Sequence, residues 1–146
     1  MRNTIVIALI CLFAAGCKKA SFTTKPQLTF KSINTNELRP GQVLEIKLTF
    51  TDAEGDVVSD SALYIEQVST FCPQTSFSRI DPITEFPVSG NLEGTILVKF
   101  GYRTLPQLQE PQCGVTDTCY FRFALRDKEK NVSDTITSAS FVLIKE

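Results

Sequence analysis

The chain has 146 residues, a length that fits one domain. Its 42% hydrophobic and 21% charged residues are typical of a globular protein and exclude disordered and collagen-like chains. Its 15 Lys and Arg against 16 Asp and Glu leave no basic excess, which argues against nucleic-acid binding through phosphates. The absence of His excludes His-based catalytic triads and the HExxH zinc motif.

The N-terminal segment is predicted to be an export signal. Arg2 precedes an apolar run, residues 5–15, that would form a helix only about 17 Å long. A bilayer core is about 30 Å thick, so this run is too short for a transmembrane helix. Small residues follow the run, as they do before the cleavage site of a secretory signal. We therefore expect residues 1–16 to be cleaved as a signal peptide.

The end of this segment reads Ala14-Ala15-Gly16-Cys17, which resembles the lipobox of bacterial lipoproteins, although Ala14 stands where Leu is usual. The resemblance implies that Cys17 becomes the first mature residue and carries diacylglycerol and acyl chains such as palmitate. Two or more such chains anchor a protein stably in a membrane. Lys18, in place of an Asp retention signal, favours the outer membrane and leaves open which face carries the protein. The alternative is an ordinary signal peptide with an incidental cysteine.

The residues after Cys17 are polar, with lysines at both ends of the segment. We interpret residues 17–25 as a lipidated tether and residues 26–146 as one folded domain. Eight extended residues reach at most about 28 Å, so the domain is expected to lie close to the membrane.

Apolar and polar residues alternate along much of the domain, which is the period of a β-strand. Every second side chain is apolar in three segments above all, namely residues 43–50, 95–100 and 119–125. Turn residues such as Pro40-Gly41 and Ser89-Gly90 separate the segments. About seven strands predict an all-β fold, a single antiparallel β-sandwich. The expected strands are residues 28–30, 43–50, 63–68, 83–88 (weaker), 95–100, 119–125 and 135–144.

Residues 119–146 also resemble the end of immunoglobulin-like and fibronectin type III-like domains of bacterial surface proteins. An aromatic-rich strand is followed by Asp127, Asn131 and Ser133 in the spacing that such domains often have. The resemblance implies an immunoglobulin-like sandwich and says nothing about activity. The Cys-Trp-Cys pattern of antibody domains is absent because the chain has no Trp.

Two acidic segments, residues 50–57 and 125–132, are similar to each other, and each follows a strongly alternating strand. In an immunoglobulin-like topology the loops after these two strands lie at the same pole. Oxygen-bearing side chains are the ligands that Ca²⁺ prefers. The candidate metal ligands are Asp52, Glu54, Asp56, Asp127, Glu129 and Asn131.

A second interpretation of these segments requires no metal. An Asp at the end of a strand commonly caps a turn through its side chain. Gly55 and Asn131 tolerate the positive φ that tight turns require. Turn-capping carboxylates and a Ca²⁺ site therefore both stay open, and no other cofactor is expected.

Three cysteines remain once Cys11 is removed with the signal and Cys17 is lipidated, an odd number for an oxidising compartment. A disulfide between Cys113 and Cys119 is favoured because it closes a short loop at a small loss of entropy. The pairs Cys72–Cys113 and Cys72–Cys119 stay open. Zinc binding and thiol catalysis are not expected without CxxC spacing or a His base.

The chain lacks the GxSxG, P-loop and glycine-rich dinucleotide motifs of common enzymes. We expect a non-enzymatic lipoprotein of the cell envelope, a binding or accessory module that holds a protein or glycan partner near the membrane. The alternative is a structural component of envelope assembly, stabilised by calcium. The sequence does not identify the partner or the oligomeric state.

Overall fold

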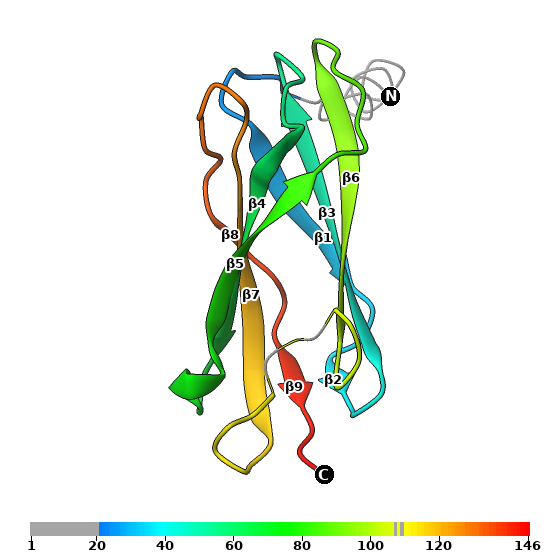
Figure 1. Ribbon diagram of the computed structural model, residues 1–146, viewed down its shortest axis with the longest axis vertical. Coiled ribbons are helices and arrows are strands. Elements are labelled where there is room, and N and C mark those ends of the chain that lie inside the picture. The colour runs from blue at the N-terminus through cyan, green and yellow to red at the C-terminus, as the bar shows by residue number, and fades with distance from the viewer. Residues whose placement is uncertain (1–20, 107, 109) are drawn as a thin grey trace, which may run out of the picture.

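The computed structural model describes residues 21–106, 108 and 110–146, so the predicted signal peptide and Cys17 lie outside the described residues. The described chain forms strands β1 to β9 in two facing sheets (Figure 1). None of its described segments is a helix with the length and apolar character needed to cross a bilayer. The prediction of an all-β sandwich is confirmed, with nine strands in the described chain where about seven were predicted and with one parallel strand pair in place of a fully antiparallel arrangement.

The smaller sheet has three strands in the order β1-β3-β6, formed by β1 (Gln27–Ile33), β3 (Val43–Asp52) and β6 (Leu92–Gly101). The central strand β3 pairs antiparallel with both neighbours. Its inward side chains are buried as the alternation predicted, because a strand points successive side chains to opposite faces. These side chains are Leu44, Ile46, Leu48 and Phe50.

The larger sheet has the order β2-β9-β7-β4-β5, with β8 also paired to β7. Strands β2 and β9 pair in parallel, whereas the other pairs in this sheet are antiparallel. A short 3-10 helix, η2 (Pro73–Thr75), lies between β4 and β5. The strands are β2 (Glu37–Leu38), β4 (Ser59–Ser69), β5 (Phe77–Ile83), β7 (Asp117–Leu125), β8 (Ile136–Thr137) and β9 (Phe141–Leu143).

Two predicted strands are corrected by the structure. The weaker strand at residues 83–88 is wrong, since β5 ends at Ile83 and the chain continues as a loop. The true strand contains Pro82, which lacks an N–H donor and fits only because β5 lies at the edge of its sheet. The predicted strand at residues 135–144 is split into β8 and β9. Between them Ser138 uses its backbone N–H and its Oγ to bond the backbone of Phe121 instead of continuing the ladder.

Aromatic rings join the two sheets at the centre of the core. Phe121 of β7 stacks on Phe100 of β6 with ring centroids 4.5 Å apart. It also stacks against Phe123 at 5.8 Å and Phe141 at 5.6 Å. All four rings are buried, so Phe121 packs at the centre of the apolar core that both sheets share.

The described part of the predicted tether is bound to the domain. The Thr51 hydroxyl donates to the backbone carbonyl of Ser21 at 2.8 Å, and the Ala53 N–H donates to that of Thr23 at 3.2 Å. Lys25 forms an ion pair with Asp134 at 2.6 Å. Residues 21–25 therefore lie along the end of β3 before the first strand begins.

Candidate functional site

Three carboxylates meet at one end of the sandwich, which we call the acidic pole: Asp52, Asp56 and Asp127. Asp52 ends β3 in the smaller sheet, and Asp127 follows β7 in the larger sheet, and both chain segments reach the same end of the molecule (Figure 1). One carboxylate oxygen from each residue lies within 4.8 Å of the other two. Residues 75 positions apart in the chain are thus brought together by the pairing of the sheets.

Asp52 is held by the turn that it caps. It is fully buried, and its Oδ2 accepts hydrogen bonds from the N–H groups of Gly55 at 2.7 Å and Asp56 at 3.1 Å. Burial raises the pKa of Asp52; the two N–H donors oppose the rise, and the Asp56 and Asp127 carboxylates add to it. Gly55 has a φ of +70°, and a Cβ there would lie 1.8 Å from the Ser89 carbonyl oxygen, so the turn requires glycine.

Asp127 caps the matching turn after β7. Its Oδ1 accepts the N–H of Asn131 and its Oδ2 accepts the side-chain amide of Asn131, both at 2.8 Å. The Ser133 hydroxyl accepts the N–H of Leu125 at 2.9 Å. These contacts explain the Asp-Asn-Ser spacing in the sequence. The positive φ falls on Lys130 (73°) and not on the expected Asn131. Asn131 donates both its backbone N–H and its side-chain amide to Asp127, so the residue before it adopts the conformation that reverses the chain direction.

The predicted ligand set is only partly assembled. Glu54 and Glu129 are exposed and do not belong to the cluster of carboxylates. Asn131 contacts the cluster by donating to Asp127. The turn-capping interpretation is confirmed for Asp52 and Asp127, while Ca²⁺ binding stays a prediction that now concerns three carboxylates.

The opposite pole carries a disulfide between Cys72 and Cys113, with their Cα atoms 5.7 Å apart. The favoured pair Cys113–Cys119 is therefore wrong, and the pair Cys72–Cys113 that stayed open is the one formed. Cys119 belongs to β7 and faces the core beside Phe121, fully buried. Cys113 lies in the loop before β7, close to η2, which Cys72 precedes. The short spacing between Cys113 and Cys119 did not decide the pairing, because β7 directs the Cys119 side chain into the core, away from Cys113.

A buried acid that sequence reasoning missed supports this disulfide. The Ser69 hydroxyl donates to the carboxylate of Asp117, which is 1% exposed. Ser69 Oγ in turn accepts the N–H of Cys72 at 2.8 Å, and Asp117 accepts the N–H of Phe71 at 3.2 Å. Alternation along β7 could have found Asp117, because it shares a face with Cys119 and Phe121.

Cys119 is expected to be unreactive in the folded protein. Its thiol is free and buried, and burial together with the Asp117 charge raises its pKa to about 12. Because the thiolate is the nucleophile, iodoacetamide at about pH 8 should leave native Cys119 unmodified. In concentrated urea the same thiol should gain one carbamidomethyl group, as measured by intact mass and peptide mapping. Complete labelling of Cys119 under native conditions would contradict this placement.

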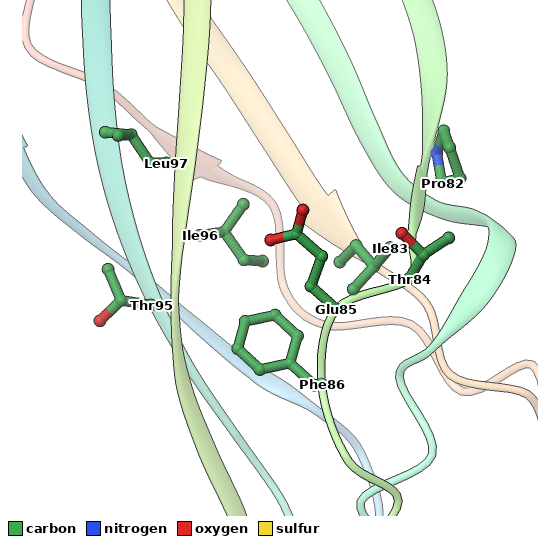
Figure 2. A pocket seen from close by; sticks show the side chains of 8 residues that line it. All are labelled: Pro82, Ile83, Thr84, Glu85, Phe86, Thr95, Ile96 and Leu97. Atoms are coloured by element: carbon green, nitrogen blue, oxygen red, sulfur yellow. The ribbon is translucent and has the colours of Figure 1, made fainter.

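A groove of about 300 Å³ lies between β6 and the chain that leaves β5. Figure 2 shows the side chains of Glu85 and Phe86 reaching toward Ile96 on β6. Phe86 packs edge-on against Phe50, with ring centroids 4.9 Å apart. The groove is lined by Pro82, Ile83, Thr84, Glu85, Phe86, Thr95, Ile96 and Leu97.

Comparison with known proteins identifies no family. No family model matches the chain, and no curated protein matches it. Among solved structures, the chain is similar to the sporulation control protein Spo0M from Bacillus subtilis, with 7% sequence identity and a TM-score of 0.48. The match covers 84% of this chain and 50% of that one, so this chain spans about half the length of Spo0M.

Proposed function

We propose that this protein is a lipid-anchored, non-catalytic binding or accessory module of the bacterial cell envelope, with an immunoglobulin-like domain. The observation that carries the proposal is Ala14-Ala15-Gly16-Cys17 directly after an apolar run of signal length. The Cys72–Cys113 disulfide supports it independently, because disulfides persist mainly in oxidising compartments outside the cytosol. Lys18 supports the outer membrane as the destination.

The anchor would orient the domain. Only Lys18, Lys19 and Ala20 separate Cys17 from Ser21, a span of at most about 14 Å. Ser21 is hydrogen-bonded to Thr51 near the end of β3, so a lipid on Cys17 would hold the acidic pole beside the bilayer. The disulfide pole and the C-terminus lie at the other end of the sandwich and would face away from the membrane, toward a partner (Figure 1).

A non-catalytic role is supported by the chemistry of the side chains. The chain has no His to act as a general base near neutral pH. Its free thiol among the described residues, Cys119, is buried with a pKa raised to about 12, which is the opposite of an activated nucleophile. A binding or accessory role needs neither group.

The anchor is tested by expressing the full chain in bacteria fed with labelled palmitate. Wild type should incorporate the label, lose residues 1–16 and sediment with outer membranes on a density gradient. The Cys17→Ala variant should lose both label and membrane association. Cys11→Ala is the matched control and should behave as wild type, because Cys11 lies in the cleaved signal. A mature protein with an unmodified Cys17 thiol would overturn the proposal.

The binding role needs a second experiment, on intact cells. Crosslinking of the anchored wild type, followed by purification and mass spectrometry, should recover a discrete protein partner, or a glycan array should show selective binding. Absence of any selective partner in both assays would contradict a binding module.

A further inference from the structure

We propose that Asp52, Asp56 and Asp127 bind one Ca²⁺ ion, which joins the two sheets at the acidic pole. The inference does not depend on lipidation, because it concerns only residues of the folded domain. One oxygen from each of the three carboxylates lies within 4.8 Å of the others. Oxygens bound to one Ca²⁺ at 2.3–2.6 Å lie at most about 5 Å apart, so the three can share an ion after little movement.

Unpartnered oxygens provide the second observation. Three buried side-chain nitrogen or oxygen atoms in the described part of the chain have no hydrogen-bond partner, and two of them are Oδ1 of Asp52 and Oδ1 of Asp56. Asp52 as a whole is fully buried. Burying a carboxylate is strongly unfavourable unless its oxygens are paired or coordinate a metal. The two oxygens without a hydrogen-bond partner therefore belong to residues of the acidic cluster, whose negative charge a bound cation would neutralise.

Hydrogen bonds within the two turns orient the carboxylates of Asp52 and Asp127 before a cation binds. Asp52 directs its Oδ2 to two backbone N–H groups, which leaves Oδ1 without a donor. Asp127 is oriented by both donors of Asn131. The carboxylates of Asp52 and Asp127 are therefore held in place by their own turns before any ion arrives, which reduces the entropy lost on binding.

An ion here would link a turn that follows the smaller sheet to a loop that follows the larger sheet. Asp52 and Asp56 belong to the turn between β3 and β4, and Asp127 belongs to the loop after β7. A backbone hydrogen bond of 3.3 Å from the Lys128 N–H to the Asp56 carbonyl already connects them. A ligand that binds only the folded state stabilises it by mass action. Sites in extracellular modules bind Ca²⁺ with dissociation constants of about 10⁻⁴ to 10⁻³ M.

The test is a calcium titration of the purified mature protein after removal of metals with EDTA. At about 10 mM CaCl₂ the equilibrium constant for unfolding should fall by about 10-fold to 100-fold, and the melting temperature should rise accordingly. Isothermal titration calorimetry should find one site. MgCl₂ at the same concentration should produce a smaller effect. No response of the wild type to CaCl₂, or an equal response to MgCl₂, would overturn the assignment.

Variants locate the site. Asp56→Asn should abolish the response to CaCl₂. The variant should remain folded, because Asp56 is only half-buried and the asparagine amide has nearly the same shape as the carboxylate. Asp60→Asn removes the same charge from a nearby exposed residue outside the cluster and should respond as wild type. A full calcium response in Asp56→Asn would overturn the proposal. Should Asp56→Asn not fold, calorimetry of the wild type still decides whether the protein binds Ca²⁺.

Discussion

Replacing Phe121 by alanine is expected to lower the free energy of unfolding by about 3–5 kcal/mol, the range for truncating a buried aromatic side chain. Phe121 is fully buried and stacks on rings from β6, β7 and β9 at once. The truncation removes apolar contacts and leaves a cavity between the sheets that close packing prevents from collapsing fully. Urea unfolding followed by circular dichroism measures the loss.

The matched control for this variant is Phe71→Ala. Phe71 is 70% exposed, so the same truncation there should change the free energy of unfolding by no more than about 0.5 kcal/mol. Equal losses for the two variants would show that Phe121 does not occupy the centre of the core.

Removing the disulfide is expected to have a similar effect. Cys72 and Cys113 are separated by 41 residues, and in the chain-entropy description a loop of this size stabilises the fold by about 4 kcal/mol. The double variant Cys72→Ala with Cys113→Ala should therefore lose about that amount. Chemical denaturation of the variant against the oxidised wild type measures it.

Two controls separate the bond from the side chains. Wild type kept in dithiothreitol should lose nearly as much stability as the double variant, because it lacks the same crosslink. Val115→Ala alters an exposed residue in the same loop and should be nearly neutral. A double variant within about 1 kcal/mol of oxidised wild type would contradict a structural role for the Cys72–Cys113 bond.

Local pattern was a good guide where one strand face is buried. Alternation along residues 43–50 predicts one apolar face, and the side chains of that face, Leu44, Ile46, Leu48 and Phe50, are all buried. The pattern failed at β5, whose side chains alternate less clearly and which contains Pro82. An edge strand tolerates proline, so the position of β5 in its sheet had to be known before its sequence could be interpreted.

For the candidate site, too, the local features could be predicted from the sequence and the long-range contacts could not. That Asp52 and Asp127 cap turns follows from their own neighbours in the chain, and both do so. Which carboxylates approach one another was not local information. Glu54 and Glu129 come from the same two segments, yet both point to solvent while Asp56 joins the cluster.

The amino-acid sequence alone determined the strand character of this chain, the inward faces of β3 and β7 and the chemistry of the two turns. These features depend on residues within a few positions of one another, whose side chains a strand or turn places predictably. The tertiary structure decided that Cys72 pairs with Cys113 and that Asp52 meets Asp127. The expected topology already placed the two acidic loops at one pole, but such contacts join residues far apart in the chain, and only the packing of the two sheets determines which side chains meet there.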